Sequence, residues 1–450
     1  MTTTNSRIEL HSCEPSPPER TTSLLHRVFG ADSGPIRQLN WYTPRSDDPA
    51  FVHCHAWVAA PPGQPSAQPL SVGGTATNRT VALAKAIGEA VERYCGSVYD
   101  ADRVQVMSHR EAKGEAIDPR RFVLFHDSQY EAGFGINRVD EDSPIGWTRG
   151  YSLTNDRPVW VPASMVYTEY QALTVQEPFE VTPVSGYACG NTLEEALLGG
   201  ICEVVERDAF MIHWYQRLPT DGIDLRTLQS AQAKETLERY RNCPVRLFCA
   251  NITTDLGIPA VAALMTSQHP GWPAAAIATA ASTDPERAVV RALQELSSNH
   301  LYVRDSADAR AGDIPHGPEQ VTSQEDHGLL YTHPRWLTQL DSLLRPRSRI
   351  SIGDVPGREF SDMKDAVEHC VANLHEAGHE VLFADLTTPE LAEQGFKVVK
   401  VLIPGLQPVD FGPHYRHLGG RRLYEVPGRL GHDHVGRCPP ELNSFPHPFP

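Results

Sequence analysis

The spacing of apolar positions predicts a chain that mixes strands with long helices. Apolar residues recur at alternate positions from Phe51 to Ala59, a spacing typical of a strand, and short apolar runs at 159–161, 245–249, 273–281, 381–385 and 398–403 also indicate strands. A repeat of three to four residues predicts helices over about 80–94, 192–216, 284–300 and 363–377. The pattern therefore favours an α/β (α+β) fold.

Residues that cap or break regular structure mark the expected boundaries. Asn191 is the expected cap of the helix over 192–216, and Asp284 followed by Pro285 is expected to start the next one. Residues 305–320 are polar and contain Gly and Pro, so we expect a surface loop there. Residues 1–40 are expected to form a flexible N-terminal arm and residues 41–426 the folded domain. The six prolines of residues 427–450 predict a polyproline-like tail without helix.

Composition narrows the class of protein. The 450 residues are 40% hydrophobic and 21% charged, enough apolar surface for a sizeable core. The net charge of −16 argues against a non-specific nucleic-acid binder and against an anionic-membrane binder. No apolar run approaches the ~20 residues that cross a bilayer, and no signal peptide is visible, so we expect a cytoplasmic protein. The nine cysteines form no CxxC pair and are expected to be reduced and mostly buried.

The most informative feature is a repeated acidic pattern, GEAVER at 88–93 and CEVVER at 202–207. Each copy places two glutamates three positions apart, which puts both on one helix face. The surrounding residues are mostly small or apolar, so we expect the acids to face an interior site. The four acids are Glu89, Glu92, Glu203 and Glu206.

Converging carboxylates need a compensating proton or cation. Two carboxylates ~4 Å apart repel by about 4 kcal/mol at an effective dielectric near 20. Oxygen ligands select Mg²⁺ or Ca²⁺, and Mg²⁺ usually arrives with substrate phosphates. The alternative is two unrelated helices whose glutamates form surface pairs with the neighbouring arginines.

Two further patterns are compatible with an anion site beside the acids. Arg287, Arg291 and Glu295 are spaced by four and share one helix stripe, which is either an ordinary salt-bridged face or a phosphate-binding one. The segment VSGYACGN at 184–191 carries two glycines before a helix, so it either offers backbone N–H groups to an anion or only shapes a turn. No GxxxxGK[ST] loop is present.

Histidine pairs leave a transition-metal site open as an alternative. The pairs are His53 with His55, His414 with His417, and His432 with His434. The first pair shares one face of a strand, as zinc ligands can. The apolar face of that strand is formed by Val52, Cys54, Ala56 and Val58, so the two rings are expected to meet solvent.

Taken together, these segments resemble the YcaO-type family of ATP-dependent enzymes that modify peptide backbones. The segment SGYACGNTLEEALLGGICEVVERDAF at 185–210 is similar to the family's most characteristic stretch, GEAVERY at 88–94 to its first acidic motif, and RALQE at 291–295 to its third. The segments VLIPGLQP at 401–408 and LGGRRLY at 418–424 and the ending PHPFP at 446–450 resemble the azoline-forming branch, represented by the stand-alone D protein of thiazole/oxazole-modified peptide biosynthesis. The resemblance covers about residues 20–450.

The resemblance implies a single large YcaO-like domain whose mixed sheets pack with the helices that carry the acidic motifs. It implies a cyclodehydratase that converts Cys, Ser or Thr of a ribosomal precursor peptide to thiazoline or oxazoline. ATP would be held through Mg²⁺ on Glu89, Glu92, Glu203 and Glu206. Other residues would contact nucleotide or order the metal ligands, namely Arg93, Ser185, Asn191, Arg207, Arg291 and Glu295. The terminal carboxylate of Pro450 would reach the active site as a proton-transfer group.

The sequence departs from the family pattern at three positions. Gly74-Thr75-Ala76 stands where the family often has Gly-Lys-Gly, Lys85 replaces a common serine, and Ser298 replaces a glutamine. These departures leave the four glutamates intact, while the individual nucleotide contacts stay open.

Partners and alternative functions follow from the same resemblance. A separate ThiF-like protein is expected to bind the leader of the precursor peptide, and a flavin dehydrogenase that oxidises azolines to azoles stays open as a further partner. A homodimer is the default oligomer. Two other functions stay open, a YcaO-type enzyme that installs a thioamide or amidine, and a non-catalytic scaffold for the precursor peptide.

Overall fold

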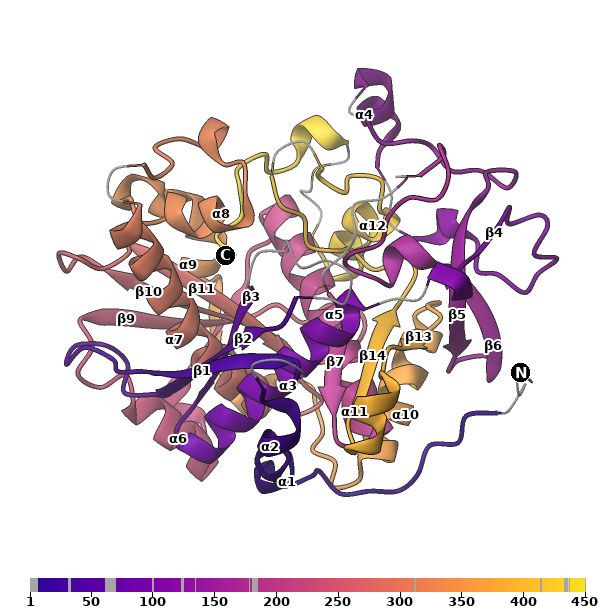
Figure 1. The fold of residues 1–450 in the computed structure, drawn as a ribbon. Helices are drawn as coiled ribbons and strands as arrows, with labels where there is room; N and C mark the ends of the chain where they lie inside the picture. The colour runs from indigo at the N-terminus through magenta and orange to yellow at the C-terminus, as the bar shows by residue number, and fades with distance from the viewer. Residues whose placement is uncertain are drawn as a thin grey trace.

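Three sheets and a set of long helices build the molecule (Figure 1). The computed structural model describes residues 7–30, 34–60, 70–98, 101–122, 125–133, 135–177, 179, 185–310, 313–412, 415–432, 436 and 438–449. Within these residues, the first sheet has the strand order β1-β2-β3, the second β11-β10-β9-β8-β12, and the third β4-β5-β13-β14-β7, with β6 paired to β5. The expected mixed α/β architecture is confirmed.

The strands are mostly antiparallel, and only β12 and β8 pair in parallel among the pairs that the described strands form. The strands of the first sheet are β1 (Ile36–Tyr42), β2 (Val52–Val58) and β3 (Leu70–Ala76). Those of the second are β8 (Asp221–Ile223), β9 (Val245–Asn251), β10 (Ala260–Ser267), β11 (Ala275–Ala281) and β12 (Ser348–Ile350). Those of the third are β4 (Gln105–Met107), β5 (Ile145–Ser152), β6 (Arg157–Pro162), β7 (Tyr187–Gly190), β13 (Leu382–Asp385) and β14 (Lys397–Leu402).

Three long helices carry the motifs singled out in the sequence, and each lies on a sheet. Helix α3 (Arg79–Ser97) packs on β2 and β3, α5 (Leu193–Gln216) packs on β7 and β14, and α7 (Pro285–Ala309) packs on β10 and β11. Helix α5 also contacts β11, and α3 also contacts β7, so the three helices meet between the sheets. This meeting point brings sequence-distant motifs together.

Shorter helices surround this frame. They are α1 (Pro18–Ser23), α2 (Leu25–Val28), α4 (Asp127–Ala132), α6 (Ala231–Glu238), α8 (Gln324–Leu330), α9 (Asp341–Leu344), α10 (Met363–Glu376), α11 (Pro389–Glu393) and α12 (Arg421–Arg429). Helix α10 packs on α5, and α12 also contacts α5 (Figure 1). Helix α5 is therefore at the centre of the molecule, and most of its second half is buried.

Two predicted helix ends were wrong and one was right. The N-cap of α5 is Thr192, whose hydroxyl accepts a hydrogen bond from Glu195 N–H at 3.2 Å, and not Asn191. Asp284 caps α7 as expected, with Pro285 in the first turn. Helix α7 continues to Ala309, so the loop expected from residue 305 is displaced, because the buried Arg304 pairs with Asp48 and ties this turn to the core.

Residue 40, where the sequence places the end of the N-terminal arm, lies inside β1. Residues 1–6 and 31–33 lie outside the described residues. In the described part, α1 packs on α3, and the Arg20 guanidinium donates to the carbonyl of Asn191 at 3.2 Å. Sequence polarity concealed this packing, because the segment is held largely by hydrogen bonds to α5 and its preceding turn.

The C-terminal segment also differs from the expectation of a tail without helix from residue 427. Helix α12 runs to Arg429 and contains Pro427. Proline lacks the N–H that would pair with the carbonyl of Leu423. The side-chain amide of Gln216 donates to that carbonyl at 2.8 Å, so the helix keeps this acceptor satisfied. Beyond α12, the described residues hold only a short 3₁₀ turn at Pro439–Glu441.

All nine cysteines are free thiols, and five of them are buried, as the sequence predicts. In the part of the chain that the structure describes, no helix is both long enough and apolar enough to cross a membrane.

Candidate active site

A cavity of about 1210 Å³ lies where α3, α5 and α7 meet. Nine of the eleven predicted site residues line it, namely Glu89, Glu92, Arg93, Asn191, Glu203, Glu206, Arg207, Arg291 and Glu295. Ser185 does not line this cavity, and Pro450 lies outside the described residues. The expectation that the two glutamate pairs converge on one interior site is therefore met by the fold.

The first acidic pair is held by its own arginine and by strand β3. The Arg93 guanidinium lies 3.8 Å from a carboxylate oxygen of Glu89 and 3.8 Å from one of Glu92. The backbone N–H of Gly73 donates to Glu89 at 3.2 Å. Helix geometry puts the two acids on one face, and the strand fixes the direction of the first.

The second pair repeats this arrangement on α5. Arg207 lies 3.5 Å from Glu203 and also pairs with Glu206. The N–H of Gly186 donates to Glu203 at 3.0 Å, and the Thr279 hydroxyl donates to Glu206 at 2.5 Å. Each acidic pair therefore has the same set of partners, one arginine from its own helix and a donor from a neighbouring strand or turn.

Gly186 has to be glycine for this contact to form. Its φ of +90° is a conformation that side-chain-bearing residues rarely adopt. A Cβ there would also lie 2.3 Å from the carbonyl oxygen of Val401 on β14. The turn before β7 is therefore pressed onto β14, which presents the Gly186 N–H to Glu203.

The cavity perturbs its carboxylates in the direction expected for crowded acids. Burial raises the pKa of Glu92 well above its usual value, and the charges of Glu203 and Glu89 raise it further against the opposing effect of Arg93. Burial, followed by the charge of Glu206, raises the pKa of Glu295 to about 7. A cation among these acids would favour their ionised forms.

The donor set fits Mg²⁺ in its chemistry. Four carboxylates from two helices supply the oxygen ligands that this ion prefers. As the side chains stand, no three His, Cys, Asp or Glu residues among those described are grouped closely enough to hold one ion. The acids turn instead toward arginines and backbone N–H groups, and they would have to turn away from these partners to share one ion.

The cavity also carries cations that the sequence reasoning only partly identified. Lys85, Arg287 and Arg291 all line it. The Lys85 ammonium donates to the Thr75 carbonyl at 2.9 Å and to Gln294 at 2.7 Å. Burial, reinforced by the charge of Arg291, lowers the pKa of Lys85 to about 8. Lys85, noted in the sequence only as a departure, therefore faces the site.

Lys400 was missed entirely, because a single lysine in an apolar strand gives no periodic signal. It is buried on β14, donates to the Ser185 carbonyl at 2.6 Å and lies 3.9 Å from the centre of the Tyr187 ring. Burial lowers its pKa to about 7, although Glu203 and Glu92 raise it. Lys400 therefore anchors the turn that carries Ser185, whose nucleotide contact stays a prediction.

The histidine pairs behave differently from the zinc alternative. His53 is buried and its Nδ1 is 2.9 Å from the Thr75 hydroxyl, so the expectation that it meets solvent was wrong. The ring faces α7, which covers that side of the strand, and only His55 lines the cavity. His414 and His434 lie outside the described residues.

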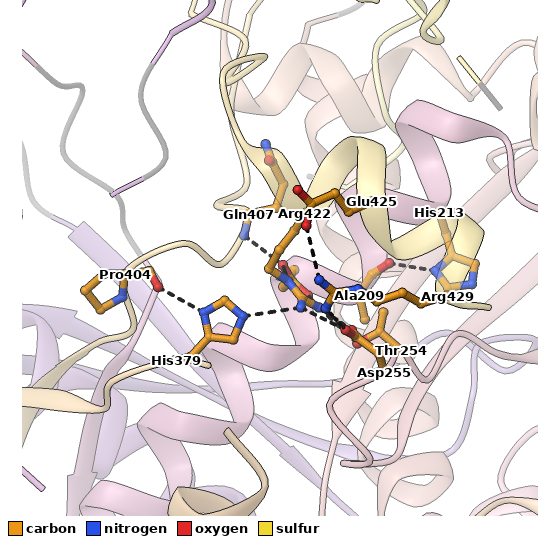
Figure 2. A network of polar contacts seen from close by, with 11 residues as sticks. Ala209, His213, Thr254, Asp255, His379, Pro404, Gln407, Arg422, Glu425 and Arg429 are labelled. Atoms are coloured by element: carbon orange, nitrogen blue, oxygen red, sulfur yellow. Dashed lines mark hydrogen bonds and ion pairs between the residues drawn. The ribbon is translucent and has the colours of Figure 1, made fainter. Parts of the chain in front are cut away.

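Behind the cavity, a buried ion network ties α12 to α5. The Arg422 guanidinium pairs with Asp255 at 2.8 Å (Figure 2). It also pairs with Asp208 at 2.7 Å, and the N–H of Gln407 donates to Asp208 at 2.8 Å. Asp208 follows Arg207 directly, so the two C-terminal motifs around residues 407 and 422 brace the acidic helix.

Comparisons with known proteins agree with this geometry. The family model described as "YcaO cyclodehydratase, ATP-ad Mg2+-binding" matches residues 73–407. An uncharacterized protein of Methanothermobacter thermautotrophicus is 27% identical over 349 residues, which are 76% of this chain and 82% of that protein.

Two solved structures share the fold. A heterocyclase in complex with substrate and cofactor has a TM-score of 0.82 and 28% identity over 99% of this chain. This chain spans 59% of the length of that heterocyclase. YcaO from Methanopyrus kandleri, bound with AMPPCP and Mg²⁺, has a TM-score of 0.64 and 20% identity, and covers 87% of this chain and 91% of its own.

Proposed function

Because this chain belongs to the YcaO family, whose members bind ATP and Mg²⁺, we propose that it is an ATP-dependent cyclodehydratase of a ribosomal precursor peptide. The observation that carries the proposal is the convergence of two glutamate pairs, each with its own arginine, on one large cavity. A cavity of about 1210 Å³ exceeds the range of ordinary small-molecule pockets, so it has room for a nucleotide and part of a peptide.

In this proposal the acids hold Mg²⁺, and the cations that line the cavity hold phosphate oxygens. Glu89, Glu92, Glu203 and Glu206 are the metal ligands. Arg93, Arg207, Arg291, Asn191 and Glu295 contact the nucleotide or orient those ligands. Lys85 also binds phosphate in this proposal, since its ammonium has one N–H beyond the two that the protein already binds.

The reaction balances with ATP as co-substrate. A Cys, Ser or Thr side chain of the peptide adds to the preceding amide carbonyl and loses its proton. ATP supplies the phosphoryl group that lets the former amide oxygen depart as phosphate. The amide nitrogen loses its proton as the C=N bond forms, and the products are an azoline, ADP and phosphate. The chain's own residues orient the two substrates and keep the amide oxygen next to the γ-phosphate.

The C-terminal segment supports the cyclodehydratase over the thioamide or amidine alternative. Phe449 is buried, and its ring lies 4.3 Å from the Arg207 guanidinium carbon. Residues at the end of the chain therefore contact the acidic site. We propose that Pro450, one residue further, brings a carboxylate for proton transfer, as in the azoline-forming branch.

A scaffold without catalysis is a weaker candidate. Several buried carboxylates that face one another oppose folding unless a cation binds among them. Since a peptide-binding scaffold needs no such cluster, retaining it is more consistent with a nucleotide-dependent enzyme.

The decisive experiment combines the chain with Mg²⁺-ATP, a Cys-, Ser- or Thr-rich precursor peptide and a ThiF-like partner. We expect the peptide to lose one water per ring, measured by mass spectrometry, with one phosphate released for each. The Glu203→Gln variant should neither bind Mg²⁺-AMPPCP nor cyclise. Glu235→Gln is the matched control, because Glu235 forms the same i,i+4 pair with an arginine, Arg239, on an exposed helix.

Two outcomes would count against the proposal. Undiminished nucleotide affinity in Glu203→Gln would remove the assigned role of the acids. Sulfur or nitrogen incorporation without loss of water from a Cys, Ser or Thr side chain would favour the thioamide or amidine alternative. A third outcome concerns only the partner, since cyclisation by this chain alone would show that no partner is needed.

We propose the cytoplasm as the compartment of the reaction.

A further inference from the structure

The last described residues of the chain occupy a seat built from α5, α8 and the residue after α8. Three consecutive carbonyl oxygens of this segment each accept a hydrogen bond from the ring or ring hydroxyl of a neighbouring side chain. The pairs are Trp214 Nε1 to Phe445 at 3.0 Å, the Tyr331 hydroxyl to Pro446 at 2.7 Å, and His327 Nδ1 to His447 at 2.9 Å. Figure 1 shows the C-terminal end beside α8.

The seat binds backbone carbonyls because this segment has few backbone N–H groups. Pro446 and Pro448 have no N–H, so the segment cannot pair as an ordinary strand. Its carbonyls are the backbone groups left to hold, and aromatic-lined grooves bind proline-rich segments in the same way. The three donors therefore hold the segment through groups that its prolines leave available.

The ring nitrogens of both histidines are fully used in one protonation state. His327 donates through Nδ1 and its Nε2 accepts from the Gly412 N–H at 3.0 Å. His447 donates through Nε2 to the Asp410 carbonyl at 2.6 Å, and its Nδ1 accepts from the Phe449 N–H at 3.3 Å. Both rings are therefore neutral, and they define one register for the segment.

The register places Phe449 against the acidic site. Its ring lies 4.3 Å from the Arg207 guanidinium carbon and 5.7 Å from the centre of the Phe210 ring. Arg207, Phe210 and Trp214 follow one another at spacings of three and four, so they share one face of α5. The helix that carries Glu203 and Glu206 thus also carries one wall of the seat.

We propose that Trp214, Tyr331 and His327 are positioning residues for the reaction. They hold the C-terminal segment by three backbone carbonyls, and Phe449 then stacks on the arginine that pairs with Glu203 and Glu206. This inference rests on the proposed function. It adds to it a defined set of side chains that places the end of the chain at the cavity.

The test compares two tyrosines whose hydroxyls each donate to one backbone carbonyl, one in the seat and one outside it. Tyr331 donates to Pro446 at 2.7 Å, and Tyr424 donates to the Leu418 carbonyl at the same distance but outside the seat. Each Tyr→Phe change removes one hydroxyl. We expect Tyr331→Phe to lower kcat for cyclisation about tenfold, because a buried carbonyl loses its donor. KM for the peptide and the affinity for Mg²⁺-AMPPCP should change less than twofold, and Tyr424→Phe should keep the wild-type kcat.

Hydrogen–deuterium exchange supplies a readout independent of activity. The peptide that covers residues 443–449 should exchange faster in Tyr331→Phe than in the wild type and in Tyr424→Phe. His327→Asn, which keeps a donor close to the position of Nδ1, should retain more activity than His327→Leu.

Equal kcat values for the two tyrosine variants, or wild-type exchange of residues 443–449 in Tyr331→Phe, would overturn the inference. Failure of the proposed function looks different, because the wild-type protein would then neither bind Mg²⁺-AMPPCP nor cyclise a peptide. In that case faster exchange in Tyr331→Phe would still establish the seat, but the positioning role would be refuted.

Discussion

Replacing Glu92 by glutamine tests directly whether the acids are kept for a cation. The Glu92 side chain is 15% exposed and lies 3.8 Å from Arg93. At an effective dielectric near 20, that pair attracts by about 4 kcal/mol. Glu89, three positions earlier on the same helix and so about 6 Å away, repels Glu92 by about 3 kcal/mol. Burial, and the charge of Glu203 after it, also oppose the ionised form, so the pKa of Glu92 is raised well above its usual value despite Arg93. Ionised Glu92 therefore carries a net cost in the metal-free protein.

Glu92→Gln should therefore stabilise the metal-free protein and abolish metal-dependent binding. We expect its Tm in EDTA to rise by about 1–3 °C, since a large protein responds weakly to each kcal/mol. Adding Mg²⁺-AMPPCP should raise the Tm of the wild type by ligand linkage and leave the variant unchanged. Differential scanning calorimetry measures both effects on the same samples.

The opposite signs of the two effects separate a ligand-binding acid from a structural one. If Glu92 served only as the partner of Arg93, replacing it would lower the stability of the protein. A lower Tm for Glu92→Gln in EDTA, together with an undiminished response to Mg²⁺-AMPPCP, would refute the reasoning. Glu235→Gln, on an exposed helix, should shift neither quantity.

Three further predictions address other parts of the molecule. Lys85→Met should weaken Mg²⁺-AMPPCP binding about tenfold by titration calorimetry, Lys85→Arg should weaken it less, and Lys234→Met on exposed α6 should have no effect. The pKa of His447 is lowered by burial to about 3. Between pH 6.5 and about 3 the unfolded chain binds this proton and the folded chain does not, so denaturant titrations should show stability falling as pH falls, by about 1.4 kcal/mol per unit from this residue. Gly186→Ala should cost more than about 2 kcal/mol in urea unfolding, because its Cβ would meet a β14 carbonyl at 2.3 Å. Gly378→Ala, with a similar positive φ and no clash, should cost only about 1 kcal/mol, and equal losses for the two would contradict this account.

The apolar period and the acidic motifs were sufficient to predict the long helices and the faces that carry the glutamates. Helices over 79–97, 193–216 and 285–309 agree with the predicted regions apart from their ends. The i,i+3 spacing of Glu89 with Glu92, and of Glu203 with Glu206, predicts shared faces because helix geometry is local. These conclusions need no knowledge of the rest of the chain.

Other features depended on contacts between distant segments. Helix α7 extends past residue 305 because Arg304 pairs with Asp48 across the core. Pro427 sits inside a helix because Gln216, on another helix, satisfies the carbonyl that it leaves free. In each case a partner remote in sequence outweighs the local preference.

Some features of the site are also local in sequence, and others depend on the fold. Residue types and spacings identify which acids could share a cation, since those properties belong to single helices. Lys85, Lys400 and the seat of the C-terminal segment became visible only in three dimensions. A lone lysine or a single aromatic donor has no period along the chain, and its chemistry depends on which distant charge or carbonyl the fold places beside it.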